Sequence, residues 1–197
     1  MRRLYSVGLL VGLNIGTVQA AESFHTRLDL KTCLRRSEDI ESVTWACRGL
    51  NGVRVYVTTS DARMSVSYGT NAQREPAATT WFGPLNSAGP TIEWRTERSD
   101  TKPYATIVRW FLRDPEGTGR RSVLVVTRLG PGPVCHIAYI DSAANPNANK
   151  LARQAADEYA RGFRCNVEAV RTVGRVGRGV TLIRKTLSSP TSSGGPI

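Results

Sequence analysis

The sequence predicts an α+β domain that consists mostly of antiparallel β-sheet, with one C-terminal helix packed on the sheet. Apolar and polar residues alternate along much of the segment 24–141, a pattern typical of strands with one buried face. Turn-forming residues separate these runs without an intervening helical pattern, which favours antiparallel neighbours. We therefore expect about seven or eight strands, one helix and two disulfides.

The first strands are expected between residues 24 and 68. The alternation is clearest in Val53–Val57 and Met64–Tyr68, and Asn51-Gly52 supplies the positive φ of a tight turn before them. Four longer strands are predicted at 91–96, 104–113, 122–129 and 134–141. The intervening stretch, 69–90, is rich in Gly and Pro and is expected to form a long ordered loop with one helical turn near Ala77.

One helix is predicted after the last long strand. Asn145 can cap it, Pro146 suits its first turn, and Gly162 can end it. The apolar residues between these signals recur at helical spacing: Leu151, Ala152, Ala155, Ala156, Tyr159 and Ala160.

The N-terminus has the three parts of a secretory signal peptide. Arg2 and Arg3 precede an apolar stretch over residues 7–18, and small residues at Val18 and Ala20 mark a cleavage site after Ala20. A membrane anchor is the alternative, but the stretch is shorter than the about 20 residues that a spanning helix needs. The expected organisation is a signal peptide (1–20), one soluble periplasmic domain (21–169) and a basic, then Ser/Gly/Pro-rich flexible tail (170–197).

Four cysteines in an exported chain indicate disulfides. Four cysteines permit three pairings, and we expect Cys33–Cys47 and Cys135–Cys165, because each joins segments that the strand assignment makes neighbours. A zinc site is the competing interpretation, but no Cys-x-x-Cys or His-x-x-x-His spacing supports it. No metal or other cofactor is predicted.

No familiar catalytic motif is present. The two histidines are His25 and His136, and His136 shares a predicted strand face with apolar residues, which favours a packed side chain over a catalytic one. Glu93 and Glu97 share another strand face, but Arg95 stands between them, so a salt-bridged surface explains them better than a glycosidase pair. Trp94 and Trp110 fit the core by their alternation.

Two groups of residues are candidates for binding. Trp81 and Phe82 lie in the Gly/Pro-rich loop, where they either anchor a partner or cover a sheet edge. No acid follows Glu168, and we expect the bases beyond it to contact an acidic partner or an anionic membrane: Arg171, Arg175, Arg178, Arg184 and Lys185. Three glycines in this tail argue against a stable helix.

The segment from Cys135 to Asp141, continued through Asn145–Asn149 to Phe163-Arg164-Cys165, resembles a group of small uncharacterised exported proteins of proteobacteria, as does Thr91–Arg95. The resemblance implies export and no particular activity.

Two functions are therefore considered. The first is a non-catalytic binding or interaction protein of the cell envelope, with an envelope protein or an anionic surface as its partner. The alternative is a periplasmic hydrolase that acts on envelope material and uses His136 without a recognisable motif. Nucleic acid is not an expected partner, because no reader motif occurs.

Overall fold

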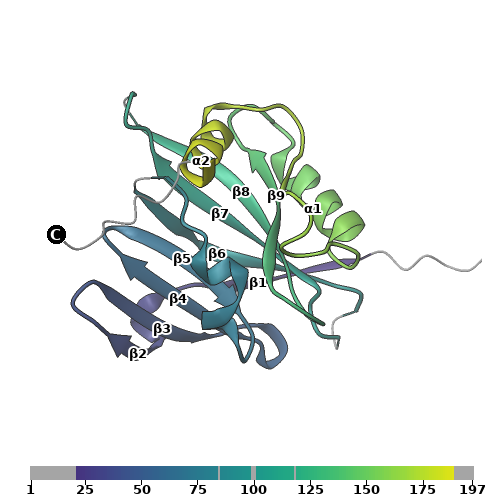
Figure 1. Cartoon of the computed structure of the whole chain (residues 1–197). Helices are drawn as coiled ribbons and strands as arrows, with labels where there is room; N and C mark the ends of the chain where they lie inside the picture. The colour runs from purple at the N-terminus through teal and green to yellow at the C-terminus, as the bar shows by residue number, and fades with distance from the viewer. Residues whose placement is uncertain (1–20, 84, 99–100, 118, 189–197) are drawn as a thin grey trace, which may run out of the picture.

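The structure is a computed structural model that describes residues 21–83, 85–98, 101–117 and 119–188. These residues form two β-sheets and two α-helices (Figure 1). The expected signal peptide with its cleavage site, and residues 189–197 of the expected tail, lie outside them. Within the described ranges, no helix is long and apolar enough to cross a membrane.

The larger sheet has six strands in the order β1-β6-β7-β8-β9-β10. Its neighbours pair antiparallel, except that the short β10 pairs parallel to β9. The strands are β1 (Glu22–Arg27), β6 (Asn86–Thr96), β7 (Ala105–Arg113), β8 (Arg120–Arg128), β9 (Cys135–Asp141) and β10 (Arg171–Thr172).

The smaller sheet is an antiparallel meander in the order β2-β3-β4-β5. Its strands are β2 (Leu34–Glu38), β3 (Ser42–Arg48), β4 (Arg54–Ser60) and β5 (Arg63–Tyr68). Short 3₁₀ turns accompany it: η1 (Leu30–Thr32), η2 (Leu50–Gly52), η3 (Ala72–Arg74) and η4 (Pro76–Thr79). The helical turn expected near Ala77 is therefore η4, whereas the rest of the expected loop is shorter, because β6 begins at Asn86.

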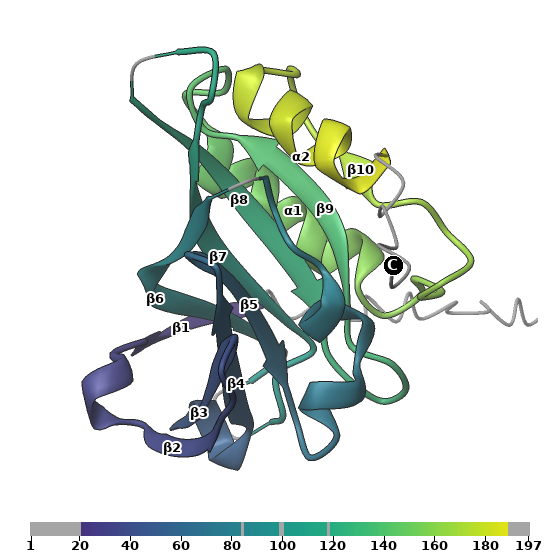
Figure 2. The same cartoon turned by 60° about the vertical axis from the view of Figure 1, so that its left-hand side comes forward.

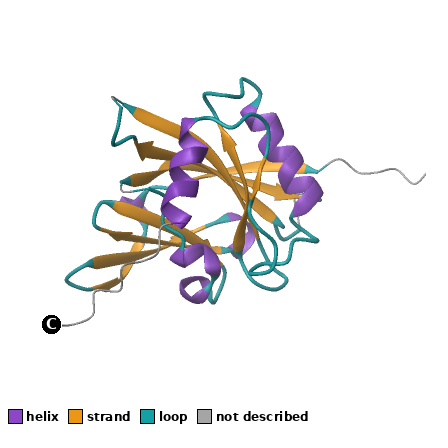
Figure 3. Cartoon of the chain, turned by 45° about the horizontal axis from the view of Figure 1, so that its top comes forward, coloured by secondary structure: helices purple, strands orange, loops and turns teal. Residues whose placement is uncertain are grey.

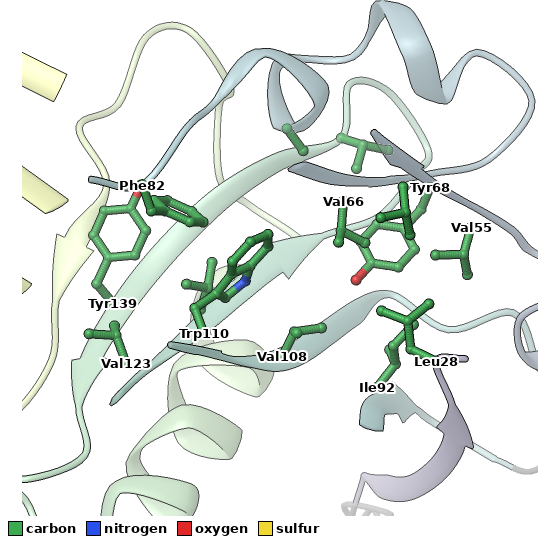
Figure 4. Close-up of a cluster of buried hydrophobic side chains, with 14 of the residues drawn as sticks. Leu28, Val55, Val66, Tyr68, Phe82, Ile92, Val108, Trp110, Val123 and Tyr139 are labelled. Atoms are coloured by element: carbon green, nitrogen blue, oxygen red, sulfur yellow. The ribbon is translucent and has the colours of Figure 1, made fainter. Parts of the chain in front are cut away.

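The main core lies between the two sheets (Figure 4). Val55, Val66 and Tyr68 from the smaller sheet face Ile92 and Val108 of the larger one. Each of these side chains is at most 3 % exposed, as alternation predicts for the inner faces of packed sheets. Burying a large apolar side chain contributes about 1.5–3 kcal/mol, so each of these side chains adds appreciably to the stability of the fold.

The two helices cover opposite faces of the larger sheet (Figures 2 and 3). Helix α1 (Ala148–Tyr159) packs its alanine stripe on one face, where Ala152 and Ala156 are fully buried. Helix α2 (Arg178–Ser188) lies on the face that also meets the smaller sheet, and its Val180 and Ile183 are fully buried. The smaller sheet and α2 thus share one face, and α1 covers the other.

The predicted fold class is confirmed. The described chain is mostly antiparallel sheet with a C-terminal helix packed on it, and Cys33–Cys47 and Cys135–Cys165 are both disulfides. The structure adds the division into two sheets, ten strands in all within the described ranges, and a second helix. Trp94 and Trp110 are core residues, at 0 % and 1 % exposure.

Two local expectations differ from the structure. Asn145 does not cap α1: its side chain accepts from the Arg175 N–H and donates to the carbonyl oxygens of Asp141 and Arg175. Residues 170–188, expected to be flexible, form β10 and α2. The glycines of this segment do not prevent the helix, because they stand before it or in its first turn.

These glycines are needed where the chain passes close to the end of β9. A Cβ atom at Gly177 would lie 2.5 Å from Asp141 Cγ, and one at Gly174 would lie 2.4 Å from Asn145 Oδ1. The Val180 N–H at the start of α2 donates to Asp141 Oδ2 at 3.3 Å. Asp141 therefore satisfies one of the free N–H groups of the helix N-terminus and places a negative charge at its positive end.

Candidate functional site

A groove of about 820 Å³ lies at one end of the interface between the two sheets. Ligand sites typically measure about 300–1,000 Å³. Its lining comes from both sheets and the loops between their strands: residues 51–54, 68–70, 101–104, 129–131, Glu97, Val134 and Arg161. Because these segments are far apart in the sequence, only the folded chain forms this site.

The loop before β4 is held tightly against the core. Asn51 and Gly52 have φ values of 49° and 77°. A Cβ atom at Gly49 would lie 2.6 Å from Trp94 Cη2 and 2.5 Å from the Val53 carbonyl oxygen. Glycine at position 49 therefore allows the loop to pack directly on the buried indole, which fixes one wall of the groove.

The opposite wall is fixed by Arg128, which is 7 % exposed. Its guanidinium donates to the carbonyl oxygens of Pro131 at 2.8 Å and Pro133 at 2.7 Å, and to that of Ala160 at 2.9 Å. These contacts tie the turn after β8 to the end of α1. The groove is thus bounded by two braced loops, as expected for a largely preformed site.

Buried hydroxyl groups lie in the layer behind the groove. The Tyr68 ring lines the groove and packs edge-on against Trp94, with ring centroids 5.6 Å apart. Burial raises the pKa of the Tyr68 hydroxyl, and the facing Thr106 hydroxyl only partly offsets this rise. Among the described residues, neither hydroxyl has a hydrogen-bond partner of standard geometry. Tyr68 therefore stays neutral and, at 1 % exposure, belongs mainly to the core behind the groove.

Charge is gathered at the rim of the groove. Arg54, Lys102 and Arg161 are its basic lining residues, and Glu97 is its acidic one. Arg161 Nη2 donates to Glu97 at 3.0 Å, and its guanidinium carbon lies 3.8 Å from the centroid of the Tyr104 ring. The rim therefore has a net positive charge, whereas Leu129 and Val134 in the lining are buried and apolar.

A second group of ionisable side chains lies between α1 and the larger sheet. Glu93 accepts from Ser23 at 2.5 Å and from Arg153 at 2.6 Å. Burial acts to raise the pKa of Glu93, but the hydrogen bonds from Arg153 and Ser23 outweigh it and leave the pKa below its ordinary value. With Glu93 bound in this way and Glu97 paired with Arg161, the two carboxylates do not form a glycosidase pair.

The same group includes an ion pair between the buried Arg95 and the partly exposed Asp157. Arg95 donates to both Asp157 oxygens, at 2.9 and 2.7 Å, and to the Ala21 carbonyl oxygen at 3.1 Å. The Tyr104 hydroxyl donates to Asp157 at 2.6 Å, and burial together with this bond raises the pKa of Tyr104 to about 12. These bonds join β1, β6 and α1, so the network is a structural brace for the start of β1.

His136 is enclosed in the core. It is 5 % exposed, its Nδ1 lies 2.9 Å from Thr127 Oγ1, and the centroid of its ring is 5.1 Å from that of Phe82. Burial lowers the pKa of the imidazole to about 3, so the ring is neutral at physiological pH. Its Nε2 has no hydrogen-bond partner in the described part of the chain, and His136 is not among the groove residues. The arrangement gives it no route to a substrate.

The two loop aromatics that were candidates for binding, Trp81 and Phe82, differ in how far their side chains are buried. Phe82 is 0 % exposed and packs edge-on against Trp110 and Tyr139, with centroids 4.9 and 5.7 Å away. It therefore covers the sheet and cannot anchor a partner in the folded protein. Trp81 is half-buried, with the Arg63 guanidinium 5.5 Å from its ring centroid. Neither residue lines the groove.

The five C-terminal bases do not form a bare cationic surface. Arg178 pairs with Asp114 and Glu116, at 2.9 and 2.7 Å. Arg171 pairs with Glu168 and stacks on the Tyr159 ring. The Arg184 guanidinium donates a hydrogen bond to Thr172, and Lys185 Nζ lies 3.7 Å from the Glu116 carboxylate. Arg175 is exposed. The apolar side chains by which α2 packs on the core, among them Val180 and Ile183, are buried, whereas Val176 and Leu187 remain exposed, so contact of this segment with an anionic membrane stays a prediction.

The groove residues were not among the sequence candidates. Arg54, Lys102, and Leu129 with Val134 come from three separate segments that no local motif joins. The available signal was indirect: turns that contain Gly or Pro adjoin each of these segments.

Comparison of the chain with protein-family models, with curated proteins and with solved structures finds no match in any of the three. The function must therefore be argued from the geometry of the described residues.

Proposed function

We propose that this chain is an exported binding protein of the bacterial cell envelope that holds a ligand non-covalently in the groove between its sheets. The groove carries this proposal: it is large enough for a small molecule, it is braced on two sides, and it combines an apolar lining with a charged rim.

Export and a periplasmic location are supported by the signal-peptide pattern that ends at Ala20 and by the two disulfides, which persist in oxidising compartments. Strand β1 begins at Glu22, directly after the expected cleavage site. We expect the chain recovered from a periplasmic fraction to begin at Ala21, which intact-mass measurement checks. A chain that retains residues 1–20 would refute this cleavage site.

Binding accounts for the groove better than catalysis does. Its acidic lining residue, Glu97, is already paired with Arg161. Its tyrosine hydroxyls, of Tyr68 and Tyr104, have raised pKa values and remain protonated. The hydrolase alternative relied on His136, whose burial leaves it without a supporting observation.

The expected interaction through the C-terminal bases is also less well supported than the groove, because most of these bases are paired with acids or stacked on the protein itself. A small ligand is therefore the occupant that we propose, in place of an envelope surface.

The test uses N-phenyl-1-naphthylamine, a neutral apolar dye that fluoresces when it is removed from water. Thr70 is an exposed groove residue, and Thr70→Trp should fill the groove at little cost to folding. Thr91→Trp, on exposed β6 surface outside the groove, is the matched control. We expect the wild type and T91W to enhance the dye fluorescence and T70W to lose the enhancement. Equal enhancement in all three would exclude the groove as the binding site.

A further inference from the structure

We propose that the groove selects an amphipathic anion, in which an apolar or aromatic body carries one carboxylate, sulfonate or phosphate group. This inference rests on the proposed function and adds the chemical class of the ligand. It follows from the distribution of polarity within the groove and from the state of its charged side chains.

The first argument is the separation of apolar and charged positions. The buried lining residues are mainly apolar: Tyr68, Leu129 and Val134 are at most 5 % exposed. The basic residues lie outside them, and both Arg54 and Lys102 are exposed. A ligand that fills this groove therefore meets a mostly apolar lining, to which the less buried Val53 and Pro131 also contribute, and cations at the rim, which matches a molecule with an apolar body and an anionic end.

The second argument is that, among the described residues, two of the three rim cations have no counter-ion. Arg161 is paired with Glu97 and lies on Tyr104. Within the described part of the chain, neither Arg54 nor Lys102 takes part in an ion pair. This differs from the bases of the C-terminal segment, where most are paired or stacked. Cationic side chains left open beside an apolar groove favour an anionic ligand.

The third argument comes from the neighbouring strand. Arg48 of β3 is the direct cross-strand partner of Arg54 in β4, and both are exposed. Like charges directly opposite each other on antiparallel strands are destabilising. No carboxylate of the described residues pairs with either arginine. An anion bound at this rim would offset that repulsion, so ligand binding also stabilises the protein.

The test compares two dyes that share one apolar body. The first, 1-anilinonaphthalene-8-sulfonate, carries an anionic group, and N-phenyl-1-naphthylamine lacks it. We expect the sulfonate to bind about fivefold or more tightly than the neutral dye in low salt and to lose that advantage when salt screens the rim. In Arg54→Gln/Lys102→Gln the sulfonate affinity should fall to that of the neutral dye, while the neutral dye binds as before.

Arg36→Gln/Lys31→Gln is the matched control, because it removes the same charge from exposed positions outside the groove and should leave both affinities unchanged. Equal affinities for the two dyes in the wild type, without salt dependence, would overturn the anion preference and leave the proposed function standing. An equal loss in the rim and control variants would also overturn it, because it would reflect net charge alone. Failure of Thr70→Trp to reduce either dye signal would overturn the groove itself. Where the double variant folds poorly, the single variants Arg54→Gln and Lys102→Gln, each at an exposed position, are compared with Arg36→Gln and Lys31→Gln in the same way.

Discussion

Replacement of Asp141 by alanine should release helix α2 from the rest of the protein. The Asp141 carboxylate, on a residue that is 2 % exposed, accepts from the backbone N–H groups of Ala143 and Ala144 at 3.0 Å each, and from Val180 at 3.3 Å. A buried donor left without its acceptor costs about 1–3 kcal/mol. Water can reach the N–H groups of Ala143 and Ala144 more easily than that of Val180, which is fully buried. We therefore expect the free energy of unfolding to fall by about 2–4 kcal/mol.

Urea unfolding measures the loss, and limited trypsin digestion locates it, because Arg184 and Lys185 lie within α2. Asp39→Ala is the control, because Asp39 is exposed and lies in the loop between β2 and β3. A decrease below about 1 kcal/mol for D141A, with α2 still resistant to trypsin, would refute the assigned role of this carboxylate.

A double-mutant cycle tests the close approach of the Gly177 backbone to the Asp141 side chain. A Cβ atom at Gly177 would lie 2.5 Å from Asp141 Cγ and Oδ2, so Gly177→Ala should destabilise the wild type. In the Asp141→Ala background much of that space is free, and the second substitution should cost less. We expect the two effects to be non-additive by about 0.5–3 kcal/mol, whereas simple additivity would contradict the geometry.

Two further predictions concern the wall of the groove and the network beneath α1. Gly49→Ala should lower the free energy of unfolding by about 1–3 kcal/mol, because its Cβ atom would clash with the fully buried Trp94. Urea unfolding measures this change, and an unchanged midpoint would contradict the tight packing of the loop. The pKa of Glu93 is lower in the folded chain than its ordinary value of 4.5, so its contribution to stability is present above that pH and is lost as the pH falls through the folded pKa. Glu93→Gln should therefore flatten part of the acid limb of a stability–pH profile, and a profile of unchanged slope would refute the lowered pKa.

Strands and disulfides were predictable because their signals are local. In Val53–Val57 the alternation directly reports the inner and outer faces of β4, where Val55 and Val57 are fully buried. The two disulfides followed from strand neighbours and were confirmed. The division into two sheets was not predictable in this way, because alternation shows that a strand has a buried face but not which layer covers it.

Helix α2 and the groove depend on tertiary contacts that have no local signature. In the sequence, the glycines before α2 predict a break in helical structure. In the fold, they let the backbone pass close to the side chain of Asp141, which is distant in sequence. Phe82 lies in a segment with no regular alternation, so its complete burial could not be deduced from the residues around it. The lining of the groove likewise consists of loop ends that only the assembled sheets bring together.

The pairing of β1 with β6 joins two segments that are far apart in the sequence. Glu22 pairs with Thr96, and the strands that lie between them in sequence form a separate sheet, so the first strand has no place in the larger sheet until β6 has been made. Helix α2, which completes the other end of the core, is among the last described residues to be synthesised. Folds dominated by such distant contacts form slowly. Completion of the core therefore depends on contacts that join both ends of the described chain to strands far from them in the sequence.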